Sequence, residues 1–161
     1  MPMIPDGLTL ARAIHILALV HWIGGVSAVT TIVLPQARRL GDARAAVDFF
    51  EAFERRFVRQ VRISIALAGL SGLYMLHALD AWDRFRQLSF WWLHLMVAVW
   101  CLFAMMVFVI EPLFAHRKFR EYAMRDSAGA FARITRLHML ALAISAVAIV
   151  AGVLGAHGAL P

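Results

Sequence analysis

Four apolar stretches divide this chain of 161 residues, and each is long enough to cross a lipid bilayer. A transmembrane helix needs about 20 mostly apolar residues to span a hydrocarbon core of about 30 Å. The stretches cover residues 8–34, 63–79, 90–110 and 137–156. The composition agrees, since 62% of the residues are hydrophobic and the mean hydropathy is +0.74, far above the values of soluble domains. The sequence therefore predicts an all-α integral membrane protein with one domain, residues 1–161, built as an up-and-down bundle of four transmembrane helices.

The basic residues are distributed unequally between the connecting segments. Only three of the 16 lysines and arginines lie on the side of the predicted bundle that holds both termini and the loop between the second and third stretches. They are Arg12, Arg84 and Arg86. All the others lie between the first and second stretches or between the third and fourth: Arg38, Arg39, Arg44, Arg55, Arg56, Arg59, Arg62, Arg117, Lys118, Arg120, Arg125, Arg133 and Arg136. Loops rich in lysine and arginine stay in the cytoplasm. We therefore expect a multi-pass protein of a bacterial-type inner (plasma) membrane, with both termini outside, in the periplasm. The net charge of +6 follows from this topology and indicates no nucleic-acid partner.

The helical pattern continues beyond two of the apolar stretches. Val47, Phe50, Phe53 or Phe57, and Val61 recur at spacings of three to four residues, with arginines and glutamates between them. Such spacing is typical of an amphipathic helix. We therefore expect the second helix to begin near residue 45 and the fourth near residue 130, so that both helices extend into the cytoplasm.

Three positions are expected to end or bend helices. The first helix should end near Pro35, and Pro112 should kink or stop the third, because proline lacks the backbone N–H that continues a helix. Asp126 or Ser127 is expected to cap the last helix at its N-terminus.

Two histidines lie within the apolar stretches at similar depth below the outer surface. His15 is seven residues inside Leu8, or about 10 Å deep at the rise of an α-helix. His94 is four residues inside Phe90, or about 6 Å deep on an antiparallel helix. An intramembrane imidazole is costly without a partner and is by default a candidate functional group. Because two imidazoles across a four-helix bundle can ligate the iron of haem b, His15 and His94 are the predicted axial ligands.

Two further residues of the first stretch are predicted to line the haem. Trp22 lies about 20° from His15 around the helix and so shares its face, whereas His21 lies about 120° away. His15 and His21 therefore cannot both face one central ligand. Gly25, like other small residues, would let a neighbouring helix or a flat cofactor come close.

The remaining histidines are secondary candidates for metal ligands. His77 and His157 lie at outer helix ends, where hydrogen bonding to water or a carbonyl is the simpler explanation. For His138, packing or contact with lipid headgroups is the simpler explanation. These three and His21 are kept as alternatives, whereas His116 lies in a basic segment and is expected to be solvated. No pair of histidines has the spacing of a zinc motif on one helix, and no catalytic residue can be assigned.

The first helix, in which His15 is followed by Trp22-x-Gly24-Gly25, resembles the opening helix of a family of small integral membrane proteins. The family includes the HemJ-type protoporphyrinogen oxidases and the membrane part of CopD-type copper-resistance proteins. Trp92-Leu93-His94 in the third stretch and Gly72-Leu73 in the second are also similar. The resemblance implies a role in haem binding for His15. Met96 stands where the HemJ-type proteins have a lysine. The resemblance therefore implies haem binding, but not protoporphyrinogen oxidation.

The sequence as a whole is interpreted as a b-type haem membrane protein that acts in electron transfer or as an oxidoreductase. A copper-handling protein that uses the outer histidines is one alternative, and an accessory membrane subunit without cofactor is another. The expected partners are the lipid bilayer and a redox partner or quinone. A homodimer that encloses the cofactor is a further option that the sequence leaves open.

Overall fold

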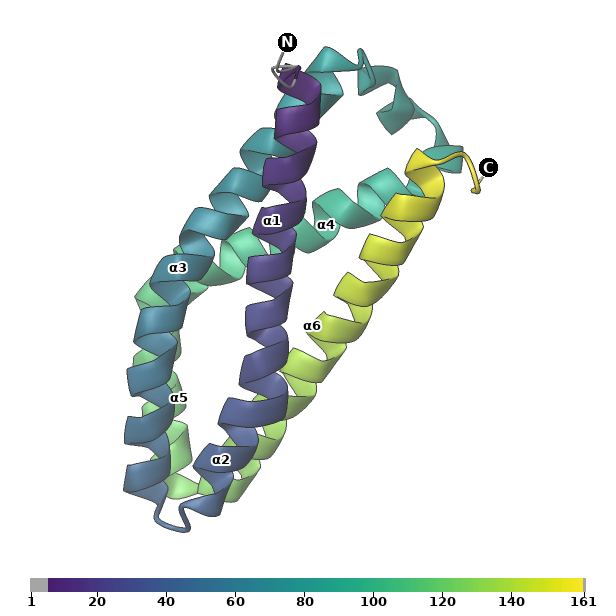
Figure 1. Cartoon of the computed structure of the whole chain (residues 1–161). Coiled ribbons are helices and arrows are strands. Elements are labelled where there is room, and N and C mark those ends of the chain that lie inside the picture. The colour runs from purple at the N-terminus through teal and green to yellow at the C-terminus, as the bar shows by residue number, and fades with distance from the viewer. Residues whose placement is uncertain (1–5, 161) are drawn as a thin grey trace.

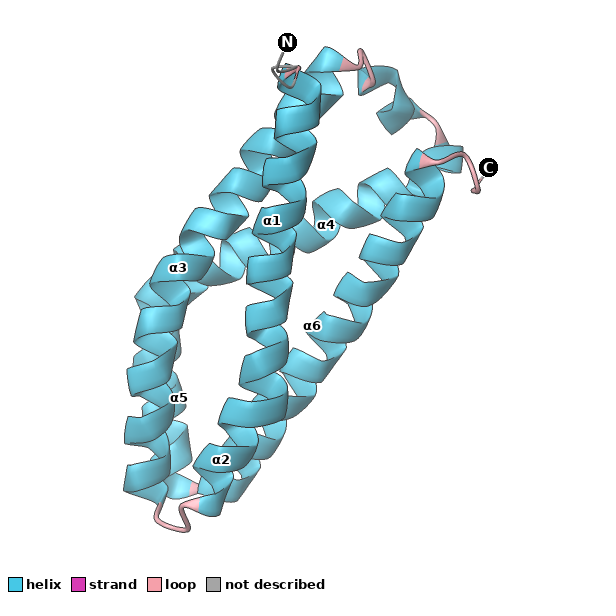
Figure 2. Ribbon diagram, viewed as in Figure 1, coloured by secondary structure: helices cyan, strands magenta, loops and turns pink. Residues whose placement is uncertain are grey.

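The computed structural model describes residues 6–160, without the side chains of residues 114–117. These residues are helical apart from short connections (Figure 2). The elements in chain order are α1 (Gly7–Ala28), η1 (Val29–Val33), α2 (Leu34–Arg39), α3 (Ala43–Ala78), η2 (Trp82–Arg86), η3 (Leu88–Phe90), α4 (Trp91–Met105), η4 (Met106–Ala115), α5 (His116–Arg125) and α6 (Ser127–Ala156). Of the four short or irregular elements, η1 and η4 are π-helical and η2 and η3 are 3₁₀-helical.

Four continuous helical runs are long and apolar enough to span a membrane. They are Gly7–Arg39, Ala43–Ala78, Leu88–Leu113 and Ser127–Ala156. Each encloses one predicted apolar stretch, apart from residue 79, which follows the second run. Large apolar side chains stay exposed along these runs, among them Leu17 and Leu70, which are 69% and 65% exposed. The all-α class and the four long helices are thus confirmed, and the exposed apolar surface suits contact with lipid.

The four runs go up and down, as predicted. Helix α1 lies antiparallel along α3, and α4 packs against α6 (Figure 1). From α4 the chain continues through η4 into α5, which runs beside α3. Both termini lie at one end of the molecule, and the connections from α2 to α3 and from α5 to α6 lie at the other (Figure 1). An even number of antiparallel runs requires this arrangement.

Aspartates cap the two helices that were expected to extend beyond the apolar stretches. The carboxylate of Asp42 accepts a hydrogen bond from the Ala45 N–H at 2.9 Å, and that of Asp126 accepts one from the Gly129 N–H at 2.9 Å. Such caps satisfy backbone donors that the first turn leaves unpaired. Helices α3 and α6 accordingly begin at residues 43 and 127, close to the predicted 45 and 130. The cap of α6 is Asp126, the first of the two predicted residues.

The first helix does not end near Pro35, so that expectation is wrong. It continues from α1 through the π-helical turn η1 into α2, as far as Arg39. The wider turn of a π-helix accommodates a residue that lacks an N–H and crowds the preceding turn. Pro112 likewise lies inside π-helical η4, where the chain changes direction between α4 and α5 (Figure 1). This bend is the kink that was one of the two outcomes expected there.

Arg62 of α3 ties this bend to the neighbouring helix. Its Nε donates a hydrogen bond to the Val107 carbonyl at 3.3 Å. That carbonyl lies five residues before Pro112, and in a π-helical pattern it would accept from the N–H that proline lacks. The guanidinium also pairs with the Glu111 carboxylate at 2.6 Å. Arg62 therefore satisfies an acceptor that Pro112 leaves unpaired and balances the charge beside it.

The predicted amphipathic pattern forms a core at the end of the molecule away from the termini. Val47 and Phe50 are buried in this core, and Val61 is buried in the adjoining cluster around Trp22. Phe53 and Phe57 are both half-buried, and their stacked rings have centroids 5.8 Å apart. The sequence pattern left open whether Phe53 or Phe57 belongs to the apolar face of the helix, and both do. The core joins α2, α3, α5 and the first turns of α6.

A charged link crosses the same region. Arg120 of α5 lies 2.9 Å from the carboxylates of both Asp48 and Glu51 on α3. Hydrogen bonding to Asp48, with the charge of Glu51 beside it, raises the pKa of Arg120 above its ordinary value. The link fixes α5 alongside the extension of α3.

Candidate functional site

His15 lies on the face of α1 that packs against α3, the same face as the buried Trp22. Its Nδ1 lies 3.0 Å from the Ala68 carbonyl oxygen and 3.0 Å from Ser71 Oγ. The ring is half-buried. Its Cε1 lies beside Gly72, where an added Cβ would be in ordinary van der Waals contact with the ring. The partners of His15 on α3 thus hold the ring in one orientation.

These partners determine which ring nitrogen of His15 carries the hydrogen. Ser71 has one hydroxyl hydrogen, which it donates within α3, to the Leu67 carbonyl at 2.6 Å or to the Ala68 carbonyl at 3.1 Å. Its Oγ therefore presents lone pairs to His15, as the Ala68 carbonyl does. With acceptors on both sides, Nδ1 carries the hydrogen and Nε2 keeps its lone pair. Most metal-ligating histidines are arranged in this way: one ring N–H is held by a backbone carbonyl or carboxylate, and the lone pair of the other nitrogen binds the metal.

His94 is held in a different way. Its Nδ1 lies 3.0 Å from the Phe90 carbonyl oxygen, and its Nε2 lies 3.1 Å from the Phe85 carbonyl oxygen. A neutral imidazole has one N–H, so only one of these contacts can be a hydrogen bond. The other places a nitrogen lone pair against a carbonyl oxygen. A neutral His94 is therefore incompletely satisfied where it lies.

The structure does not bring the rings of His15 and His94 together. His15 bonds α3, whereas His94 bonds the segment around η2 and η3 at the start of α4, beside the end of α6 (Figure 1). Among the described side chains, no three from histidine, cysteine, aspartate and glutamate lie close enough to hold a metal ion. The pairing of these two histidines stays a prediction.

Trp22 is buried and contacts Phe103 of α4 edge to face, with ring centroids 4.9 Å apart. Its indole Nε1 is the one buried side-chain polar atom without a hydrogen-bond partner among the described residues. A buried donor without an acceptor is costly and calls for an explanation. Gly25, in contrast, is already covered by the Phe57 ring of α3. Trp22 thus offers a donor inside the bundle, while the space at Gly25 is taken by a protein side chain.

The secondary histidines each lie on separate parts of the bundle. His21 bonds Ser64 Oγ of α3 at 2.7 Å, and His138 and His157 bond carbonyls one turn earlier in α6, those of Ile134 and Val153, at 2.9 and 2.8 Å. His77 is exposed at the end of α3. The side chain of His116 lies outside the described residues.

Sequence reasoning missed the residues that orient the α1 histidines. Ser64 and Ser71 are seven residues apart and share a face of α3. On antiparallel α1, His21 lies opposite Ser64 and His15 lies opposite Ser71, at a spacing of six residues. This matched spacing was the available signal. It becomes informative only once α1 and α3 are known to be neighbours.

Comparison with known proteins assigns nothing further to the site. No protein family, curated protein or solved structure matches the chain. The resemblance to HemJ-type and CopD-type proteins therefore rests on the short motifs around His15 and His94 and stays a prediction.

Proposed function

We propose that this chain is a multi-pass membrane protein that binds haem b and acts in electron transfer or as an oxidoreductase. The observation that carries the proposal is the state of His15. Its Nδ1–H is held by the Ala68 carbonyl and Ser71, which leaves the Nε2 lone pair as a ligand inside an apolar helical run. A single oriented imidazole of this kind suits haem, because the porphyrin would itself supply most of the ligands of the iron.

His94 is the proposed second axial ligand. Coordination through Nε2 would replace the contact with the Phe85 carbonyl, while the Nδ1–H kept its bond to the Phe90 carbonyl. The ring would then have the same carbonyl-anchored form as His15. Coordination would thus remove the contact between Nε2 and the Phe85 carbonyl, which a neutral ring with its hydrogen on Nδ1 cannot use as a hydrogen bond. It requires the start of α4 to move relative to α1, or a second copy of the chain to supply its His94.

The chain's own residues have three roles in this proposal. Ala68 and Ser71 orient His15 through its Nδ1–H, so that Nε2 faces away from α3 as the ligand atom. Trp22 brings an N–H donor that lacks an acceptor within the bundle. The apolar side chains of the long helices lower the local dielectric and exclude water. Bound haem would supply one-electron redox chemistry.

The first test is the colour of the purified protein. Protein expressed with ample haem should be red or brown and show a Soret band, and dithionite should sharpen the b-type α-band. A colourless protein would contradict haem binding. If that colourless protein retained copper, the copper-handling alternative would replace the proposal.

The proposed topology places both termini outside a bacterial-type inner membrane and the α2–α3 and α5–α6 connections in the cytoplasm. It rests on the concentration of arginine at that end of the molecule. In a Cys101→Ala background, an impermeant maleimide added to intact cells should label Asp83→Cys and spare Ala128→Cys. Ala128 is used in place of its neighbour Gly129, where a side chain would meet the capping carboxylate of Asp126. The reverse labelling pattern would invert the orientation.

A further inference from the structure

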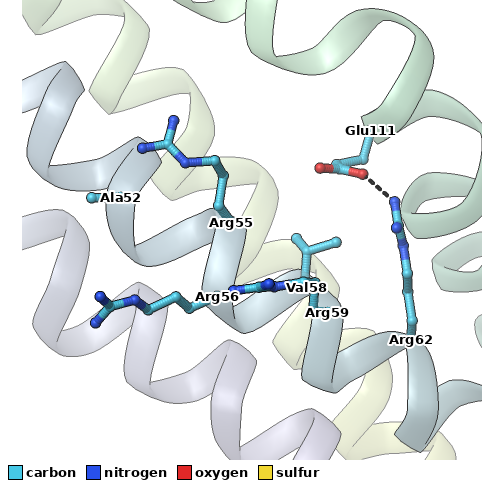
Figure 3. A pocket seen from close by; sticks show the side chains of 7 residues that line it. All are labelled: Ala52, Arg55, Arg56, Val58, Arg59, Arg62 and Glu111. Carbon is cyan, nitrogen blue, oxygen red and sulfur yellow. Dashed lines mark hydrogen bonds and ion pairs between the residues drawn. The ribbon is translucent and has the colours of Figure 1, made fainter.

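The middle of α3, beside the bend in η4, carries a row of arginines. Arg55, Arg59 and Arg62 follow one another at spacings of four and three residues, so they share one face of α3. They line an open pocket of about 490 Å³ between α3 and η4, together with Ala52, Arg56, Val58 and Glu111. Figure 3 shows Arg55 and Arg62 extending to the side of α3 on which Glu111 lies. The pocket is thus lined mainly by guanidinium groups.

The pocket carries an excess of positive charge. Its one carboxylate, Glu111, is 12% exposed and lies 2.6 Å from Arg62, so that pair is balanced. Arg55 is 61% exposed, and its nearest carboxylate, Glu51, is 3.8 Å away, which is a weak pairing. Within the described part of the chain, Arg56 and Arg59 make no ion pair. Arg55 and Arg59 therefore line the pocket with their positive charge largely uncompensated.

The position of the pocket indicates what binds there. Arg62 immediately precedes the apolar residues 63–79, so a bilayer around that stretch would place the pocket at the height of its headgroups. Guanidinium groups bind phosphate oxygens through paired hydrogen bonds. Basic pockets between helices on the cytoplasmic side are typical sites for anionic lipid headgroups.

We propose that the pocket formed by Arg55, Arg59 and Arg62 binds a phosphate group at the cytoplasmic membrane surface. Arg55 and Arg59 hold the phosphate oxygens, while Arg62 keeps its bonds to Glu111 and to the Val107 carbonyl. Because Arg62 also holds the bend at Pro112, a bound phosphate would brace α3 against η4. This site is separate from the proposed haem site and does not depend on haem being bound.

The test uses the whole protein in detergent, stripped of lipid. Native mass spectrometry should show that it retains phosphatidylglycerol in preference to phosphatidylcholine. The double variant Arg55→Gln/Arg59→Gln should bind phosphatidylglycerol about 30-fold more weakly, as expected for the loss of two basic contacts. Arg62 is left in place because it has a structural role. The matched control, Arg133→Gln/Arg136→Gln, removes the same charge from α6 and should bind like wild type.

A second measurement separates the two sources of phosphate. A rise in Tm with short-chain phosphatidylglycerol alone assigns a lipid headgroup, and a similar rise with inorganic phosphate assigns a free phosphate; either rise should disappear in the Arg55/Arg59 variant. The proposal is overturned if neither ligand raises Tm, or if the wild type retains both lipids equally and inorganic phosphate does not raise Tm. Equal losses in the pocket variant and the control would also overturn it, because they would indicate general electrostatic attraction.

Discussion

Replacing Phe50 with alanine is expected to lower the free energy of unfolding by about 3–5 kcal/mol, the usual cost of removing a buried phenylalanine. Phe50 is 2% exposed, and its ring centroid lies 5.3 Å from that of Phe119 and 6.0 Å from that of Phe131. It therefore joins α3 to both α5 and α6. The three rings lie beyond the apolar stretches, where water drives apolar burial, so the full cost should apply. Denaturant unfolding of the protein in mild detergent, followed by circular dichroism, measures the change.

The adjacent residue provides a matched control for this experiment. Phe49 is 43% exposed on the same turn of α3, so Phe49→Ala should change the free energy of unfolding by less than about 0.5 kcal/mol. Similar losses for the two variants would mean that the core around Phe50 does not form as described.

The fold was largely predictable because hydrophobic patterns reflect burial directly. The spacing of Val47, Phe50 and Val61 predicted a helix that continues beyond the apolar stretch, and α3 has this form. Asp126 or Ser127 was predicted as a cap because a side-chain acceptor before an apolar run satisfies free N–H groups, and the cap is Asp126. Pro35 misled the prediction because proline disfavours an α-helix, whereas the chain takes a π-helical turn at Val29–Val33 and places Pro35 in the first turn of α2. That choice depends on packing against other helices, which the local sequence does not contain.

The candidate site was less predictable, since it depends on how helices lie relative to one another. Helical periodicity placed His15 and Trp22 on one face, and that face is buried against α3. The Ala68 carbonyl could not be identified as a partner, because a backbone acceptor has no sequence signature. The contact between His94 and the Phe85 carbonyl likewise depends on the path of the loop before α4. Sequence can therefore place a histidine at a depth and on a face, but its hydrogen-bond partners follow only from the helix pairing.

The largest functional effect is expected at His15. His15→Ala should abolish the reduced-minus-oxidised b-type spectrum, because it removes the imidazole whose Nδ1–H is already anchored on α3. His94→Ala should abolish or strongly perturb the same spectrum by removing the second ligand. Ser71→Ala should have a milder effect: the Ala68 carbonyl still holds the Nδ1–H, so haem is retained with a shifted midpoint potential. Difference spectra and redox titration of purified variants, compared at equal protein concentration, measure all three.

The control for this series lies on the same helix. His21 also bonds a serine of α3, Ser64, but lies nearly two turns further along α1 and about 120° around it from His15, so His21→Ala should leave the spectrum unchanged. His116→Ala, in the basic segment at the start of α5, should do the same. Wild-type spectra from both His15→Ala and His94→Ala would refute the ligand assignment and leave His21, His77, His138 and His157 as candidates. Loss in His15→Ala alone would instead assign a single protein ligand on α1, and the carbonyl contacts of His94 would then be its only bonds.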